Sequence, residues 1–241
     1  MKYNKKAVSL GVFICMCACH KSTTEVAPAS LNIINAIADS QAVIPILNAD
    51  QPTNYFVNAE AISYTNAHLY SPPSGSTFIN IAQITDTVQV SPKFDLFSGT
   101  FNLLPGAIYS LFLTGDTTAL DTMFVRDNIP PYYTDSLAGV RFVNLSPGSL
   151  PISITIEGNP SSQTEFSGVG YKSITSFKTY AANNSVANSS YLFVVRDQAT
   201  GDSLASYSWS YTLFKNNTLI ISGSESSSST TPLQVFQMNN Y

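Results

Sequence analysis

The 241 residues include 11 basic and 15 acidic side chains, and only 11% of the chain is charged. Removing Lys2, Lys5 and Lys6, which lie before a predicted cleavage site, leaves 8 basic residues, a net charge of −7 and no basic cluster. This balance argues against nucleic-acid binding and against electrostatic attachment to anionic lipid.

The N-terminal segment, residues 1–18, contains the parts of a signal peptide in the expected order. A lysine-rich head is followed by an almost wholly apolar run over residues 7–18. The run is too short for a membrane-spanning helix, which needs about 20 residues. Ala18 directly precedes Cys19. A small residue before a cysteine at the end of such a run resembles the lipobox of bacterial lipoproteins, which implies an acylated Cys19 at the mature N-terminus.

The remaining cysteines support this interpretation. All three lie at or before Cys19, so the mature chain has no disulfide framework and no thiolate-bound zinc. Cys15, Cys17, Cys19 and His20 form a cluster of metal-ligand type, but its place in a signal peptide favours processing over metal binding. The alternative is an ordinary signal peptide that is cleaved without acylation of Cys19.

Residues 19–30 are polar and include Pro28, which is typical of a flexible tether. We therefore expect an outer-membrane lipoprotein whose folded part stands off the bilayer. Glu25 is the only acidic residue close behind Cys19, so the sequence does not decide between the periplasmic and the surface face.

From residue 31 onward, short alternating apolar segments are separated by turn residues about every 8–12 positions, as in β-sandwiches and barrels. In the clearest example, Ile152, Ile154 and Ile156 alternate with polar residues. No segment keeps a helical period. The predicted strands lie near residues 31–38, 43–48, 61–65, 77–84, 86–91, 100–104, 107–114, 120–126, 139–145, 151–157, 164–168, 173–180, 190–197, 202–213, 217–222 and 232–238.

Landmarks recur at a nearly constant spacing of about 108 residues, which indicates an internal duplication. The matched positions are Asn35 with Asn144, Tyr64 with Tyr171, Tyr70 with Phe177, and residues 111–115 with 219–223.

We therefore predict an all-β protein of two tandem antiparallel β-sandwich (immunoglobulin-like) domains. The first spans residues 31–126 and the second spans residues 137–241. Residues 127–136, which contain two consecutive prolines, form the predicted linker, since prolines cannot continue a central strand.

The second half resembles a known family. The segments that carry the resemblance are Val-Arg-Phe-Val-Asn at 140–144 with Ser146-Pro147, residues 152–158, and Phe-Ser-Gly-Val-Gly-Tyr-Lys-Ser-Ile at 166–174. They resemble the bacterial domain of unknown function numbered 4397; the first half matches it less well. The resemblance implies tandem β-sandwiches in an envelope lipoprotein and no established activity.

Catalytic and metal chemistry has few candidates. His68 is the only histidine after His20, so a Ser-His-Asp triad would have to use it. It lies on an alternating segment without nearby nucleophile-elbow glycines, and we expect it to face outward. One histidine and no thiols argue against a zinc site, and no phosphate-binding glycine loop is present.

Carboxylates offer the alternative chemistry. A glycoside hydrolase needs two acids across a cleft, and three pairs lie close in sequence: Asp116 with Asp121, Asp197 with Asp202, and Glu157 with Glu165. Each pair flanks a turn, where local hydrogen bonds are the usual role. Loops 116–121 and 197–202 could also hold calcium through oxygen ligands, although they lack the spacing of an EF-hand. Otherwise we expect no cofactor.

Alternate residues Tyr207, Trp209 and Tyr211 place three rings on one sheet face. Such a stripe is usually core, but an exposed one would be a platform for ligand stacking, for example on sugar rings. Arg141 is expected to cover the sheet and pair with a carboxylate. Asn35 and Asn144 are expected to bond local backbone at strand ends.

Together these features predict a non-catalytic cell-envelope lipoprotein with a binding, adhesion or structural role, attached to the membrane by its lipid anchor. Its partner would be a glycan or an envelope protein, and not a nucleic acid. A glycan-active hydrolase using paired carboxylates is the alternative.

Overall fold

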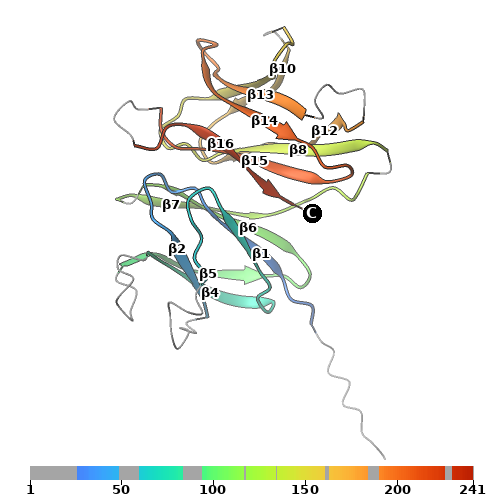
Figure 1. Cartoon of the computed structure of the whole chain (residues 1–241). Helices are drawn as coiled ribbons and strands as arrows, with labels where there is room; N and C mark the ends of the chain where they lie inside the picture. Colours follow the sequence, from blue (N-terminus) through green and yellow to red (C-terminus); the bar gives the residue numbers. More distant parts are fainter. Residues whose placement is uncertain are drawn as a thin grey trace, which may run out of the picture.

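A computed structural model describes residues 26–48, 60–83, 94–116, 118–133, 135–160, 163–183, 190–225 and 230–240. Within these ranges the protein is all-β, with 16 strands and no helix, as the sequence predicts (Figure 1). None of the described segments forms a helix capable of crossing a membrane. Residues 1–18, Cys19 and the tether up to residue 25 lie outside the described part of the chain.

The first sandwich consists of two sheets. The sheet ordered β3-β1-β6-β7 contains β1 (Ser30–Asn35), β3 (Ala67–Tyr70), β6 (Ile108–Gly115) and β7 (Leu120–Arg126). The sheet ordered β2-β4-β5 contains β2 (Val43–Leu47), β4 (Gly75–Gln83) and β5 (Phe94–Leu103).

The second sandwich repeats this plan. The sheet ordered β11-β8-β15-β16 contains β8 (Leu137–Asn144), β11 (Ser173–Ile174), β15 (Asn216–Ser222) and β16 (Gln234–Asn239), and β12 (Lys178–Ala181) also pairs with β8. The sheet ordered β10-β9-β13-β14 contains β9 (Ile152–Ile156), β10 (Thr164–Val169), β13 (Ser190–Asp197) and β14 (Ser203–Ser210).

One strand pair in each half is parallel, which adds to the antiparallel pattern expected. β1 runs parallel to β6, and β8 runs parallel to β15. Parallel neighbours need a long crossover connection. Here the intervening chain supplies it, because it passes through the opposite sheet, as β2, β4 and β5 in the first half and as β9, β10, β13 and β14 in the second.

The registers of these parallel pairs match the spacing seen in the sequence. Asn35 pairs with Leu113, and Asn144 pairs with Ile221. The spacing between the two asparagines and the spacing between their partners differ by a single position, so equivalent residues occupy equivalent positions in the two sheets.

Alternation along the strands builds a separate apolar core in each sandwich. The first core includes fully buried Ile33, Ile79 and Leu111. The second includes Phe142, Phe193 and Trp209. Burial of such side chains stabilises the fold by about 1.5–3 kcal/mol each.

A third apolar cluster joins the two sandwiches. We call it the seam; its buried residues are Ile34, Ala36 and Phe112 from the first half and Val143, Leu145, Ile220, Phe236 and Met238 from the second. The seam lies between the β3-β1-β6-β7 sheet and the β11-β8-β15-β16 sheet. Both sheets therefore bury both of their faces, which makes the described chain a four-layer body.

Hydrogen bonds across the seam are reciprocal. Thr114 Oγ1 in the first half donates to Leu145 O at 2.7 Å, and Ser222 Oγ in the second half donates to Ala36 O at 3.1 Å. The two donors stand at equivalent positions of the duplicated sequence, and so do the two acceptors. The two sandwiches thus face each other through equivalent surfaces, in the manner of an isologous dimer within one chain.

Most predicted strands match the structure within a few residues, with four departures. The strand predicted at 100–104 already begins at Phe94, as β5. Residues 61–65 form no strand: Ile62 makes an isolated bridge to Val43, and Thr65 has a positive φ of 66°. The strand that follows, β3, is absent from the strand ranges predicted above, although His68 was expected on an alternating strand there. The segment predicted at 173–180 is divided into β11 and β12. The segment predicted at 86–91 lies outside the described residues.

The segment predicted as a linker is packed along most of its described length. Asp127 is buried, and Tyr133 OH donates to Asn216 Oδ1 at 2.7 Å. Asn216 Nδ2 in turn donates to Pro130 O at 3.0 Å. These bonds hold the segment against the second sandwich.

Candidate functional site

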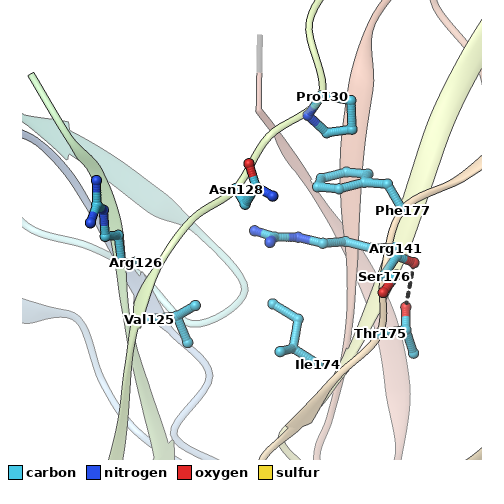
Figure 2. A pocket seen from close by; sticks show the side chains of 9 residues that line it. All are labelled: Val125, Arg126, Asn128, Pro130, Arg141, Ile174, Thr175, Ser176 and Phe177. Carbon is cyan, nitrogen blue, oxygen red and sulfur yellow. Dashed lines mark hydrogen bonds between the residues drawn. The ribbon is translucent and has the colours of Figure 1, made fainter.

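A pocket of about 440 Å³ lies where the two sandwiches meet (Figure 2). We call it the junction pocket. Its wall comes from the end of β7 and the segment after it, from β8, and from β11 with the loop that follows. The lining residues are Val125, Arg126, Asn128, Pro130, Arg141, Ile174, Thr175, Ser176 and Phe177.

Arg141 forms the buried base of the junction pocket. Its Nη2 lies 2.5 Å from Asp127 Oδ1, and its Nε donates to Thr218 Oγ1 at 2.9 Å. The guanidinium also lies 4.7 Å from the centroid of the Phe177 ring, within the range of a cation–π contact. Arg141 therefore pairs with a carboxylate, as expected. The pair is buried, since the exposed fraction of the side chain is 5% for Arg141 and 0% for Asp127.

The ion pair continues into a buried polar network. Ser110 Oγ donates to Asp127 Oδ2 at 2.7 Å, and Thr218 Oγ1 donates to Asn240 Oδ1 at 2.7 Å. Strands β6, β8 and β15 and the C-terminal end are therefore linked through one chain of hydrogen bonds. Such a network fixes the orientation of Arg141.

Arg126, at the end of β7, borders the junction pocket and is exposed, but Figure 2 shows its side chain turned away from Arg141 and Phe177. Its side chain has no ion pair, hydrogen bond or ring contact with another described residue. The other five described Lys and Arg side chains all have partners: Arg141 with Asp127, Lys172 with Asp121, Lys178 with Glu165, Arg196 with Thr155, and Lys215 with the Tyr132 ring. Within the described chain, Arg126 is the cation left without a protein partner.

The rest of the pocket wall is neutral. Thr175 Oγ1 is already used, because it accepts from Phe142 N at 2.9 Å and donates to Ser176 O at 3.2 Å. The side chains of Asn128 and Ser176 are exposed and make no hydrogen bond to another described residue. Among the described residues, no Asp, Glu, His or Cys lines the junction pocket. This described lining can donate hydrogen bonds, but it offers no acid or base for hydrolysis.

The predicted aromatic stripe is not a free stacking platform. Trp209 is 0% exposed, and its Nε1 donates to Asn217 Oδ1 at 3.0 Å. Tyr207 and Tyr211 are half-buried against the same core. Trp209 packs against Phe193, and Tyr211, directly after β14, packs against Trp209. This corrects the stacking interpretation in favour of the core interpretation.

The first two acid pairs supply turn hydrogen bonds. Asp116 Oδ1 accepts from the backbone of Thr118 at 2.7 Å and of Ala119 at 2.9 Å. The hydrogen bond from the Thr118 hydroxyl, with these backbone donors, lowers the pKa of Asp116. Asp197 Oδ1 accepts from Ala199 N at 2.7 Å and Thr200 N at 2.8 Å. Both arrangements are Asx turns, as expected.

In the third acid pair, Glu157 with Glu165, Glu165 also has a structural role. Glu165 Oε2 accepts from Lys178 Nζ at 2.5 Å and from Tyr180 OH at 2.9 Å, while Glu157 is exposed. The described residues contain no group of three or more His, Cys, Asp or Glu side chains placed to hold a metal ion. Calcium in loops 116–121 and 197–202 stays a prediction, since that observation does not cover carbonyl ligands or Thr117, which lies outside the described residues.

His68 lies on β3 and is partly exposed. Its Nδ1 is 3.4 Å from Glu60 Oε1, and its ring packs edge-on against Tyr70 with 4.7 Å between centroids. No described serine hydroxyl hydrogen-bonds to His68, so the structure does not assemble a Ser-His-Asp arrangement around it. The Tyr70 hydroxyl is buried without a partner among the described residues, and burial raises its pKa.

Asn35 and Asn144 have structural roles, as expected, but they also hydrogen-bond to backbone groups farther along the chain than expected. Each accepts from the backbone two residues ahead: Ile37 N at 3.2 Å and Ser146 N at 3.0 Å. Each also donates to a distant carbonyl, Ile62 O at 3.0 Å for Asn35 and Val169 O at 3.1 Å for Asn144.

No known protein-family model matches the sequence, and no curated protein matches it. The resemblance to the domain of unknown function numbered 4397 therefore stays a prediction.

Solved structures with a partial likeness include three binding proteins. The first is CBMbc, of family CBM26, from Eubacterium rectale Amy13K in complex with maltoheptaose; it is 10% identical, with 88% of this chain and 97% of that chain covered and a TM-score of 0.25. The second is an alpha-glucan-binding streptococcal virulence factor, 13% identical, with 80% and 92% covered and a TM-score of 0.26.

The third is a putative adhesin from Bacteroides ovatus, 10% identical, with 90% and 95% covered and a TM-score of 0.22. Scores this low do not define a shared topology. No property of the three proteins is therefore carried over to this chain.

Proposed function

We propose that the chain is a non-catalytic binding protein of the bacterial cell envelope, attached to the outer membrane by an acyl group on Cys19. One observation carries the binding role. The described lining of the junction pocket offers hydrogen-bond donors from Arg141, Asn128 and Ser176 beside the apolar side chains of Val125 and Ile174, and it includes no Asp, Glu, His or Cys. A pocket of this composition suits ligand recognition, and its described lining holds no acid or base that could activate the Ser176 hydroxyl.

The four-layer body supports the same role. Because the seam is apolar and continuous with both sheets, the two sandwiches form a stiff unit rather than two independent domains. A stiff unit keeps the two walls of the junction pocket in register. The tether predicted at residues 19–30 would present this unit away from the bilayer, although β1 begins at Ser30 and Ala29 is already buried.

The hydrolase alternative gains no support from the described acids. The Asp116 and Asp197 carboxylates close turns, and Glu165 is held by Lys178 and Tyr180. None of the three lines the junction pocket.

Membrane attachment is tested by fractionation of cells that express the full chain. The Cys19→Ala variant is expected in the soluble fraction, while the wild type is recovered with outer membranes. Continued membrane recovery of Cys19→Ala would exclude the acyl anchor. Cys17→Ala is the matched control, since it removes a neighbouring thiol and leaves Ala18-Cys19 unchanged.

Protease treatment of intact cells then assigns the face. An antibody to the second sandwich reports digestion, and a periplasmic protein reports lysis. Digestion without lysis would favour adhesion or capture of external glycans. Protection until lysis would favour a periplasmic partner, such as a cell-wall glycan or another envelope protein.

A further inference from the structure

We propose that one end of the four-layer body docks on the lipid surface through exposed apolar side chains. It is the end at which the chain enters β1, and we call it the tether end. The proposal goes beyond ligand binding in the junction pocket. It rests on the acyl anchor proposed above, because the anchor would bring this end to the bilayer.

Both sandwiches contribute to the tether end. Ser30, the first residue of β1, pairs with Ile108, the first residue of β6. Ile108 and Asn216, the first residue of β15, line one small pocket together with residues 129–132. The strands of the two facing sheets therefore begin at the same end of the body.

Exposed apolar side chains gather at the tether end. Among the described residues, nine large hydrophobic side chains are exposed, and five of them lie there: Val26, Leu104, Tyr132, Leu213 and Phe214. Three of the others lie within strands, and Leu150 lies in the loop between β8 and β9, at the opposite end. A concentration of exposed apolar side chains on one face marks a contact with a protein or a membrane.

Contacts place these side chains beside one another in two groups. Gly106 N donates to Pro28 O at 3.1 Å, which brings the turn after Leu104 against the entering chain. Lys215 Nζ lies 4.8 Å from the centroid of the Tyr132 ring, which sets Tyr132 beside the turn that contains Leu213 and Phe214. Tyrosine and lysine suit a bilayer surface, because each buries an apolar stem and keeps a polar tip among the headgroups.

The opposite end of the body carries acidic charge. Six described carboxylates lie in or next to its turns, and only Lys172 and Arg196 are there to offset them: Asp39, Asp116, Asp121, Asp197, Asp202 and Glu225. At the tether end, the turns at residues 71–74 and 104–107 contain no charged side chain. Outside ion pairs, its described charges balance: Asp135 and Glu157 against Arg126 and Lys215. An anionic bilayer would therefore repel the acidic end and accept the tether end.

The length of the tether favours the same orientation. Residues 20–26 join Cys19 to the described chain, and seven residues span at most about 25 Å when fully extended. The strands lead away from this point, and the 7 residues of β15 alone extend over about 23 Å. An acylated Cys19 would thus hold the tether end close to the bilayer and the acidic end away from it.

The test measures the depth of a nitroxide spin label on the full acylated chain in vesicles of phosphatidylethanolamine and phosphatidylglycerol. The mature chain has no cysteine after Cys19, so Leu213→Cys and Leu150→Cys each add one labelling site. Accessibility to oxygen and to a water-soluble nickel chelate gives the depth. We expect the label at position 213 about 5–10 Å inside the headgroup boundary and the label at position 150 in water.

The Leu150→Cys variant is the matched control, because Leu150 is also an exposed leucine in a loop. A label in water at position 213 would overturn docking on lipid and leave the tether end to a protein partner. Equal depth of the two labels would also overturn the proposal, since the label itself would then drive insertion.

A second substitution tests the apolar contact. Phe214→Asp, made together with Leu213→Cys, should move the label into water, because a carboxylate at this depth is costly to insert. Phe214 has a φ of 65°, a conformation that aspartate adopts readily. Leu150→Asp in the same background should leave the depth unchanged. An unchanged depth with Phe214→Asp would overturn the apolar contact, and native Trp209 fluorescence in each variant confirms that the second sandwich is folded.

Flotation of the vesicles separates this proposal from the acyl anchor. Protein that floats with the vesicles while its label at position 213 stays in water would keep the anchor and remove the docking surface. Protein that does not float would remove the anchor itself.

Discussion

Arg141 and Asp127 form an ion pair that is nearly closed to solvent, with 2.5 Å between Nη2 and Oδ1. Asp127 directly follows β7 of the first sandwich, and Arg141 belongs to β8 of the second. The pair therefore ties the chain crossing between the sandwiches to the base of the junction pocket.

Asp127→Asn should lower the free energy of unfolding by about 3–5 kcal/mol, because the Arg141 charge would remain buried without its counter-ion. Urea denaturation followed by circular dichroism measures the loss. Asp135→Asn is the control: Asp135 is exposed in the same segment and should change stability by less than about 0.5 kcal/mol. A loss in Asp127→Asn no larger than that of the control would contradict a buried pair.

The alternating segments were the most predictable part of the fold. Ile152, Ile154 and Ile156 place β9 within one residue at each end, because period-2 alternation is set by local sequence and one buried face. The turn at Thr65 could not be predicted in the same way. Thr65 adopts a positive φ without being glycine or asparagine, so no turn residue marks it. Its counterpart Lys172 has a φ of 57° and is equally unmarked.

The junction pocket could not be predicted from the sequence, for a different reason. It combines residues 125–130 with residues 174–177, and only the packing of one sandwich on the other brings them together. For Trp209, the alternating sequence pattern correctly placed the ring on one sheet face. The pattern could not show whether the opposite sheet covers that face.

Asn35 and Asn144 lead to a prediction about the two repeats. Asn35→Ala and Asn144→Ala should each lower the free energy of unfolding by about 2–4 kcal/mol, because each leaves a buried carbonyl and a backbone N–H without their partner. Urea denaturation measures both. Asn159→Ala, at an exposed turn, is the control and should be nearly neutral. A cost in only one repeat would show that the two asparagines are not equivalent.

The ion pair between Asp121 and Lys172 predicts a pH-dependent contact between the two sandwiches. Lys172 Nζ lies 2.8 Å from Asp121 Oδ1, and Tyr171 OH donates to Asp121 Oδ2 at 3.3 Å. Burial raises the pKa of Asp121, but the hydrogen bond from Lys172, with those from Thr122 N and Tyr171, outweighs burial and brings the pKa below 3.8. A depressed pKa stabilises the fold above about pH 4, and this contribution is lost as pH falls through the folded-state pKa.

Lys172→Met should therefore raise the pKa of Asp121, which carboxyl ¹³C NMR titration measures directly. Side-chain exposures of 34% for Lys172 and 44% for Asp121 limit the stability contribution to less than about 1 kcal/mol. Lys178→Met, which removes a lysine from a different carboxylate, should leave the Asp121 titration unchanged. An unaltered pKa in Lys172→Met would contradict the contact.

The apolar seam predicts that the two sandwiches unfold together. Trp209 is the only tryptophan in the chain and lies in the core of the second sandwich, so its fluorescence reports on that half alone. Ile79 is fully buried in the core of the first sandwich. Ile79→Ala should cost about 2–5 kcal/mol and should shift the Trp209 midpoint as far as the midpoint seen by circular dichroism.

The two midpoints should shift together because the seam couples the stability of the two sandwiches. If the first half unfolds, the apolar side chains of Val143, Leu145 and Ile220 lose their cover, so the second half loses stability with it. Coincident transitions from both probes, in the wild type and in Ile79→Ala, would establish one cooperative unit. A Trp209 midpoint that stays fixed while the circular dichroism midpoint falls would mean that the two sandwiches unfold independently.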